Sequence, residues 1–444
     1  MKWFTLGVLG AGCVAAVETQ DVLGRDCNCA DSMTGAGLPG SMDGLFSVAD
    51  LCSSTRIPAP NIHSLKILDL AASFEAFARF YMISGLLNRY AVATTDGGHG
   101  DDLQLSSINA ESWALSSPGN LNWHLLEDFT HVALHDMAEI SKAIITSFYG
   151  SPPHHSYFHG SSTGGRQGIM PFILMDYWPH FVMNQLGVYP KPCKLDAISA
   201  ESIKACGELD GVADGYILLP GACDSHPHVL VGKSFECDGS PATFTKPAAH
   251  VAEAAWSGPR SADGKWQWIG IAKDAKLVND GIGVATTPAV MAPYSPYPSR
   301  GSFISRRKTP GSTSPRLHMT IGMHYSTTGG KMITWHGIRD AVIPVNGTVH
   351  YYDRVLAEDS NSQDYYRFFL ASGADHSLYT ALTPQNMMDV IVDWVEQRNA
   401  SETLGAVGAD GAGTAVERDL CLYPRVQVYD SGDPSLASSF KCAE

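Results

Sequence analysis

Two stretches of the chain alternate apolar runs with helical spacing. Residues 90–95 (Y-A-V-A-T-T) are expected to form a buried strand. Residues 156–159 are expected to form a short strand that is followed by a glycine-rich turn and a helix. Between them, apolar side chains recur at the helical period, namely Leu125, Phe129, Val132, Ala133, Met137, Ile140 and Ile144, which predicts a helix over 124–148. This order of strand, helix, strand and helix is typical of a parallel α/β sheet.

The same pattern returns near the end of the chain. Residues 331–335 (K-M-I-T-W) and 366–371 (Y-R-F-F-L-A) are expected to be core strands. Residues 384–398 are expected to form an amphipathic helix whose apolar face carries Met387, Val390, Ile391 and Trp394.

Between these two halves, residues 186–325 are richer in Pro, Gly, Ser and Cys and show no alternation of strand and helix patterns. Residues 289–315 in particular are expected to lack a regular secondary structure. We interpret residues 186–325 as an insertion that forms a lid or cap. The sheet core is then expected to comprise residues 17–185 and 326–444.

The first sixteen residues have the form of a secretion signal. Lys2 supplies the charge, residues 3–14 the short apolar stretch, and V-A-A at 14–16 the small-residue cleavage site. No later segment is apolar enough to span a bilayer. The sequence therefore predicts a secreted, soluble protein, in which most of the cysteines that follow residue 16 should pair. Their number is odd, so one thiol would be left over or paired with another chain. The sequons at Asn346 and Asn399 could then carry glycans.

Composition narrows the class of protein. The chain has 444 residues, of which 44% are hydrophobic and 17% charged, which is typical of a globular protein and not of a disordered one. The 30 basic and 45 acidic residues give a net charge of −15, and there is no basic cluster. A nucleic-acid partner is therefore not expected.

The glycine-rich turn at 160–164 reads G-S-S-T-G and matches G-x-S-x-G. In that pattern a tight strand-to-helix turn exposes a serine hydroxyl, and the pattern selects Ser162 because Ser161 occupies the variable position. A purely structural turn is the alternative, since such short patterns recur by chance in a chain with 43 glycines.

An acid and a histidine follow later strands in the order that an α/β-hydrolase requires. Asp340 follows residues 331–335, and His376 follows residues 366–371. His376 would act as the base, and Asp340 would hold its tautomer and stabilise its cation. The rival acid Asp375 adjoins the histidine.

Asp96 and His99 are further rivals, and they precede the serine in the wrong order.

With these residues in place, the chain resembles the tannase and feruloyl esterase family of secreted enzymes. The resemblance runs from about residue 90 to 442 and is carried by A-V-A-T-T-D-G-G-H, S-Y-F-H-G-S-S-T-G-G-R-Q-G, E-L-D-G-V-A-D-G, L-V-G-K-S-F-E-C-D-G, G-G-K-M-I-T-W-H-G-I-R-D and Y-D-S-G-D-P-S-L-A-S-S-F-K-C. It implies an α/β-hydrolase fold with a large lid insertion. It also implies Ser162 as nucleophile, Asp340 as acid, His376 as base and the Thr163 N–H as an oxyanion donor.

The chain departs from the family pattern at several places. Ser161 and Ser377 stand where the family has cysteines that form a disulfide beside the triad. A family segment that helps to form the oxyanion site is replaced around 73–85, and the helix after Met170 does not continue into the expected core strand. Either the chain has diverged, or segments around residues 60–90 and 168–180 were misjoined in its gene model.

Residues 210–216 (D-G-V-A-D-G-Y) place oxygen ligands at alternate positions, as calcium loops do. The later glutamate of an EF-hand is missing, and two Asp-Gly turns are the structural alternative. The resemblance implies a structural calcium held by the carboxylates of Asp210 and Asp214 and the carbonyls of Val212 and Tyr216. Gly207 stands where the family has another aspartate, so the site should be weak.

The resemblance and the spacing also suggest two disulfides, Cys206–Cys223 beside this loop and Cys421–Cys442 at the tail.

The expected protein is a secreted serine esterase that hydrolyses feruloyl or galloyl esters, from small molecules or plant cell wall, without an organic cofactor. A catalytically impaired hydrolase scaffold or binding protein is the alternative, and a peptidase on the same fold is less favoured.

Overall fold

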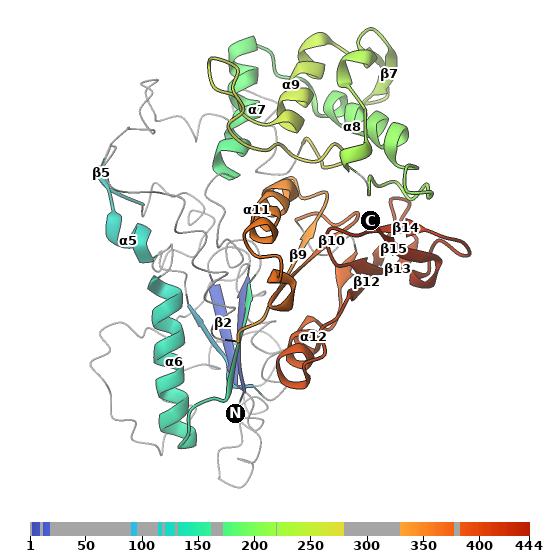
Figure 1. Cartoon of the computed structure of the whole chain (residues 1–444). Coiled ribbons are helices and arrows are strands. Elements are labelled where there is room, and N and C mark those ends of the chain that lie inside the picture. Colours follow the sequence, from blue (N-terminus) through green and yellow to red (C-terminus); the bar gives the residue numbers. More distant parts are fainter. Residues whose placement is uncertain are drawn as a thin grey trace, which may run out of the picture. The chain divides into compact units, whose positions relative to one another are not determined.

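The computed structural model describes residues 2–8, 12–17, 90–95, 114–117, 120–128, 132–160, 172–218, 220–278, 329–376 and 382–444. The chain divides into two compact units, Met1–Gly168 and Ile169–Glu444, and each is described by itself (Figure 1).

The first unit contains a four-stranded sheet in the order β1-β6-β2-β3, in which β1 runs parallel to β6 and β2 runs antiparallel to its neighbours. Its strands are β1 (Lys2–Val8), β2 (Gly12–Val17), β3 (Ala93–Thr95) and β6 (His155–Gly160). A hairpin and two helices complete the unit: β4 (Leu115–Ser117), β5 (Asn120–Leu121), α5 (Trp123–Glu127) and α6 (Ala133–Tyr149).

The helix predicted over 124–148 corresponds to α5 and α6, and residues 129–131 between them lie outside the described residues. At the start of α5 the Asn122 side chain accepts a hydrogen bond from the Leu125 N–H. Helix α6 then runs from Ala133 and ends at Gly150, whose φ of +75° favours glycine. Met137 and Ile145 of α6 are buried and pack toward the strand at Ala93. The strand predicted at 156–159 is confirmed as β6.

The segment predicted as a secretion signal supplies β1 and β2. Both strands pair with β6, with Lys2 opposite His155 and Val14 opposite His159. Mostly apolar, strand-forming residues can take such places in a sheet. The secretion signal stays a prediction.

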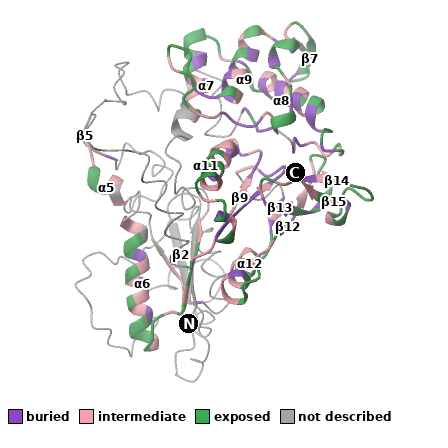
Figure 2. Ribbon diagram, viewed as in Figure 1, coloured by how far each residue is buried: buried purple, intermediate pink, exposed green. Residues whose placement is uncertain are grey.

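In the second unit, residues 172–257 form three helices, α7 (Phe172–Leu186), α8 (Pro192–Cys206) and α9 (Lys246–Ser257). Two 3₁₀ turns and a hairpin accompany them: η4 (Pro220–Ala222), η5 (Pro227–Leu230), β7 (Ser234–Cys237) and β8 (Ser240–Thr243). Figure 2 shows the buried face of α9, where small alanines allow close packing among these helices. Helices α8 and α9 lie within the predicted insertion, where the sequence shows no alternation of strand and helix patterns because alanine and serine spacing concealed them.

The strands at the centre of the second unit are β9 (Met332–Gly337) and β10 (Tyr366–Ala371), and they confirm the two predicted core strands. They pair in parallel, with Tyr366 opposite Met332 and Ala371 opposite Gly337. Helix α11 (Val345–Glu358) and the turn η7 (Ser362–Asp364) connect them. The buried Tyr352 of α11 donates its hydroxyl to the Tyr366 carbonyl and packs on Phe368.

The C-terminal part adds β11 (Thr383–Pro384), α12 (Met387–Val392), the π-helix η8 (Asp393–Gln397), β12 (Thr403–Ala409), β13 (Ala415–Cys421), β14 (Val426–Tyr429), η9 (Ala437–Ser439) and β15 (Phe440–Ala443). The helix predicted over 384–398 begins three residues late because Pro384 lies in β11, paired with β12. The apolar face is as expected, since Met387 and Val390 pack against the core.

Three disulfides are present among the described residues: Cys193–Cys237, Cys206–Cys223 and Cys421–Cys442. The last two confirm the predicted pairings, and the first was not predicted. Among the described helices, none has the length and apolarity that a bilayer crossing needs.

Candidate active site

Asp340 and His376 follow the two parallel strands of the second unit, and the structure brings their side chains together. Asp340 lies in the turn after β9, and His376 in the turn after β10. Because both strands run in the same direction, their carboxyl ends meet at one edge of the sheet. The His376 Nδ1 lies 2.9 Å from the Asp340 Oδ2.

The Asp340 carboxylate is buried and held by four N–H groups. Its Oδ1 accepts the backbone N–H groups of Val342 at 2.9 Å and Ile343 at 2.7 Å. Its Oδ2 accepts from His376 and also faces the His336 Nε2 at 3.3 Å. Burial alone would raise the pKa of Asp340, but hydrogen bonds from the two histidines hold that pKa well below its usual range. Asp340 therefore stays ionised and can orient the imidazole of His376.

Sequence reasoning missed His336, although it stands in the H-G-I-R-D motif four residues before the acid. Its Nε2 faces two acceptors, Asp340 Oδ2 and the Ile343 carbonyl at 3.0 Å, so this nitrogen must carry a proton. Its Nδ1 lies 2.8 Å from the Thr348 Oγ1 in the first turn of α11. His336 thereby ties the acid's carboxylate to α11.

The turn that carries His376 is fastened by two close backbone approaches. A Cβ on Gly337 would lie 2.4 Å from the Ala374 carbonyl oxygen, and the Arg339 N–H donates to that same oxygen at 2.9 Å. Gly373 has a φ of +70°, and a Cβ there would lie 2.5 Å from the Tyr216 ring. Only glycine fits at both positions without displacing the turn.

Tyr216 connects this turn to the loop at 210–216. Its buried ring packs on Gly373, its hydroxyl donates to the Ala409 carbonyl at 2.8 Å, and the Arg339 guanidinium lies 5.1 Å from the ring centre. The Arg339 Nε also donates to the Asp274 carbonyl at 3.0 Å. Arg339, which directly precedes Asp340, therefore holds residues of the predicted insertion against the turn that carries His376.

The nucleophile side of the predicted site is only partly described. Strand β6 ends at Gly160, and Ser161, Ser162, Thr163 and Ser377 lie outside the described residues.

The rivals Asp96 and His99 also lie outside the described residues. The predicted acid Asp340 is hydrogen-bonded to the His376 Nδ1.

The loop 210–216 folds as two aspartate turns. Oδ1 of Asp210 accepts the Val212 N–H at 3.2 Å, and Oδ1 of Asp214 accepts the Tyr216 N–H at 3.1 Å. Gly211 and Gly215 supply the positive φ angles of 96° and 83°.

Burial, followed by the nearby charge of Asp210, raises the pKa of Asp214 to about 6. Burial also raises the pKa of Asp210. The loop therefore offers two carboxylates that are costly to ionise, together with backbone carbonyls. Oxygen atoms of this type are the ligands that a hard cation such as calcium prefers. The buried Arg418 lies 3.7 Å from Asp214 Oδ2 and already balances part of the charge.

A Cβ on Gly207 would lie 2.7 Å from the Ile203 carbonyl oxygen, so the further aspartate of the family pattern has no room here.

In the described part of the chain, one group of three possible metal ligands lies within 4.8 Å of one another: Cys193, Cys237 and Asp238. The two sulfurs of this group form a disulfide, so it does not provide thiolate ligands.

Comparison with known proteins identifies the family. The family described as tannase and feruloyl esterase matches residues 78–181 and 312–443. A probable feruloyl esterase of Arthroderma benhamiae is 30% identical over 88% of this chain and 82% of its own length. The chain belongs to the tannase and feruloyl esterase family. Tannase of Aspergillus oryzae is 24% identical over 73% of this chain and 71% of its own length.

Solved structures of the family establish the fold. Feruloyl esterase B from Aspergillus oryzae matches with a TM-score of 0.64 and 21% identity, over 83% of this chain and 81% of that one. Tannin acyl hydrolase from Aspergillus niger matches with a TM-score of 0.61 and 21% identity, over 81% and 77%. The predicted α/β-hydrolase fold and the resemblance to the tannase and feruloyl esterase family are both confirmed, and the chain is a carboxylic ester hydrolase.

Proposed function

We propose that this protein is a serine esterase that hydrolyses phenolic carboxylic esters through Ser162, His376 and Asp340. The observation that carries the proposal is the 2.9 Å contact between His376 Nδ1 and Asp340 Oδ2 at the carboxyl edge of parallel strands. In an α/β-hydrolase this pair serves a serine on a G-x-S-x-G turn, and the sequence of residues 160–164 matches that pattern.

In the proposed reaction the Ser162 hydroxyl attacks the ester carbonyl while His376 Nε2 takes the serine proton. The Thr163 N–H donates to the developing oxyanion. Collapse of the tetrahedral intermediate breaks the ester bond, and His376 returns its proton to the leaving alcohol. Water then attacks the acyl-enzyme by the same route and releases the acid. Throughout, the Asp340 carboxylate accepts the Nδ1 proton and stabilises the imidazolium.

Feruloyl esters are the preferred substrate in this proposal, with galloyl esters second. The relative that is 30% identical carries the name probable feruloyl esterase, whereas tannase is 24% identical. The insertion at 186–325 would act as a lid over the core formed by residues 17–185 and 326–444. It would supply the pocket for the aromatic acid.

Substitution of the serines tests the proposal. Ser162→Ala should reduce kcat for methyl ferulate by roughly 10⁴–10⁶, while the matched change Ser161→Ala should be mild. A fluorophosphonate probe should label wild type at Ser162 and fail to label Ser162→Ala. Equal losses from both substitutions would refute the assignment of the nucleophile. No labelling of folded wild type would favour the impaired scaffold instead.

We further propose that the loop 210–216 binds calcium weakly, through the carboxylates of Asp210 and Asp214 and the carbonyls of Val212 and Tyr216. The raised pKa values of the two acids support this, because a divalent cation would relieve their cost of ionisation. Titration calorimetry should detect calcium binding that Asp210→Asn abolishes. Identical heats for wild type and Asp210→Asn would end this part of the proposal.

We also propose that the protein is secreted after cleavage near residue 16 and is glycosylated. Asn399 is exposed, whereas Asn346 is half-buried in the first turn of α11, so Asn399 is the better acceptor. Mass spectrometry of the culture medium should find a mature N-terminus near residue 17. An intact Met1 in the medium would contradict cleavage.

A further inference from the structure

Three aromatic side chains of the second unit form a partly exposed strip, which we call the aromatic strip: Trp266, Trp268 and His350. The rings of Trp266 and Trp268 are stacked with centroids 6.2 Å apart and an interplanar angle of 26°. The His350 ring meets Trp268 edge to face at 6.2 Å. Trp266 is 46% exposed, and His350 is exposed as well. Neighbouring exposed aromatic rings form an apolar patch, and such a patch with polar residues around it is typical of a binding site.

The backbone that carries the two indoles is held firmly. The Gln267 N–H donates to the Pro259 carbonyl at 2.9 Å, and Ser261 N–H donates to the Lys265 carbonyl at 2.9 Å. At its base, Gly270 lies so close to the end of α9 that a Cβ there would be 2.2 Å from the Ala255 carbonyl oxygen. A ligand that stacks on this strip would therefore meet a surface that is already formed.

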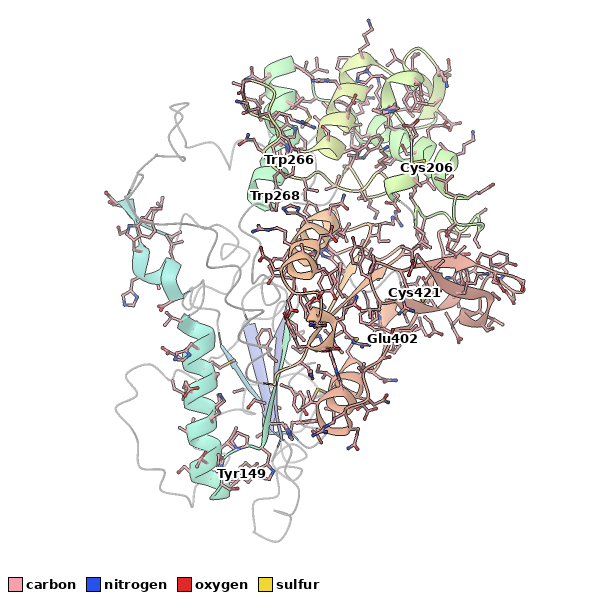
Figure 3. The ribbon with its side chains drawn as sticks, in the orientation of Figure 1. Tyr149, Cys206, Trp266, Trp268, Glu402 and Cys421 are labelled. Carbon is pink, nitrogen blue, oxygen red and sulfur yellow. A yellow bond between two sulfur atoms is a disulfide. The ribbon has the colours of Figure 1, made fainter. Side chains whose placement is uncertain are left out.

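The aromatic strip lies beside the helix turn that supports the catalytic acid. A Cβ on Gly347, in the first turn of α11, would lie 3.9 Å from the Trp268 ring. The next residue, Thr348, contacts His336 at 2.8 Å, and His336 contacts Asp340 at 3.3 Å. Since α11 begins directly after β9, this turn is at the carboxyl edge of the parallel strands. Figure 3 shows both tryptophans at this end of α11.

We propose that the aromatic strip binds a sugar ring on the alcohol side of the ester, namely the sugar that carries the phenolic acyl group. This inference rests on the proposed function. The flat C–H face of a sugar stacks on an open indole, while the sugar hydroxyls remain in contact with water and with polar groups at the rim. The exposed Lys265 and Asp263 side chains, 2.7 Å apart, provide such a rim beside Trp266.

Other occupants fit the strip less well. A feruloyl ring is flat and largely apolar apart from one phenolic hydroxyl and a methoxy group, so it gains most from an enclosed pocket, which these exposed rings do not form. A stable protein partner needs roughly 800 Å² of surface on each side, which is several times what two indoles offer. A sugar of one or two rings matches the size of the strip.

The test compares two esters of the same acid, methyl ferulate and a feruloylated arabinoxylo-oligosaccharide. We divide kcat/KM for the sugar ester by kcat/KM for the methyl ester. Trp266→Ala should lower this ratio about tenfold, because KM for the sugar ester rises. Trp266→Tyr keeps an aromatic face and should retain most of the ratio. Val229→Ala removes another exposed apolar side chain and should leave the ratio as in wild type. Circular dichroism confirms that each variant is folded.

A direct binding measurement separates this inference from the proposed function. Titration calorimetry with the unesterified arabinoxylo-oligosaccharide should show binding to wild type and about tenfold weaker binding to Trp266→Ala. If wild type hydrolyses neither ester but binds the oligosaccharide at the strip, the esterase proposal fails and the sugar site stands.

The sugar site would be overturned if Trp266→Ala lowered kcat/KM equally for both esters. It would also be overturned if Trp266→Ala changed neither kcat/KM nor the binding of the oligosaccharide. A change of oligomeric state in Trp266→Ala would overturn it as well, as would the finding that a glycan on Asn346 covers the strip in wild type.

Discussion

Replacing Asp340 by asparagine tests the arrangement of the acid and the base most directly. The side chain keeps its shape, so the outcome depends on which way the new amide points. The Val342 and Ile343 N–H groups, at 2.9 and 2.7 Å, require an acceptor at the Oδ1 position. The amide oxygen must therefore stay there, and the amide nitrogen takes the Oδ2 position, 2.9 Å from His376 Nδ1.

An amide nitrogen at that position donates a hydrogen bond and cannot accept one. The His376 Nδ1 must then offer its lone pair, which moves the ring proton to Nε2. A protonated Nε2 cannot take the proton of the nucleophile. Loss of the correct tautomer in a serine triad lowers kcat by roughly 10⁴, which corresponds to about 5.5 kcal/mol in the activation free energy.

Steady-state kinetics with methyl ferulate at neutral pH measures the effect. Asp340→Asn should lower kcat by about four orders of magnitude with little change in KM. The matched control is Asp375→Asn, which removes the charge of the neighbouring acid and should cost less than tenfold. A loss below tenfold for Asp340→Asn, or a larger loss for Asp375→Asn, would refute the role assigned to this carboxylate.

Two further predictions concern acid stability and backbone fit, and a third concerns the tail. The pKa of Asp340 is lower in the folded protein than the ordinary value of 3.8. The charge of Asp340 therefore stabilises the fold above about pH 3.8, and this stabilisation is lost as the pH falls through the folded pKa. The difference in unfolding free energy between wild type and Asp340→Asn, from urea titrations, should therefore shrink below pH 3.8; a constant difference would contradict it. Gly373→Ala would bring a methyl carbon to 2.5 Å from the tyrosine ring packed there and should cost about 2–4 kcal/mol in unfolding free energy. The control Gly239→Ala has a similar φ of +73° but open space around it, and should cost only about 1 kcal/mol; equal costs would argue against the ring contact. Replacing both Cys421 and Cys442 by serine opens a loop with a sequence separation of 21 and should cost about 3 kcal/mol, measured in the same titrations. An unchanged midpoint would show that the tail is held by its strand pairing alone.

The sequence by itself determined the strands that position the acid and the base. Residues 331–335 (K-M-I-T-W) and 366–371 (Y-R-F-F-L-A) are short segments rich in aromatic and aliphatic side chains, which favours strands, and both segments overlap strands β9 and β10. The polar residues that follow such strands must lie at the carboxyl edge, so Asp340 and His376 could be paired before any coordinates were known. The cysteine spacing and the family motifs likewise indicated two of the three disulfides that lie among the described residues.

Only the tertiary structure decided the contacts that depend on side chains from distant segments. His336 lies in an apolar strand and looks like a core residue until its two nitrogens are seen between Asp340 and Thr348. The packing of Tyr216 on Gly373 joins a loop to a turn more than a hundred residues away, and no periodicity records it. Helical and strand periods report which face of an element is buried, because burial repeats along the element. They carry no information on which distant side chain covers that face, and this pairing is set by how the whole chain packs.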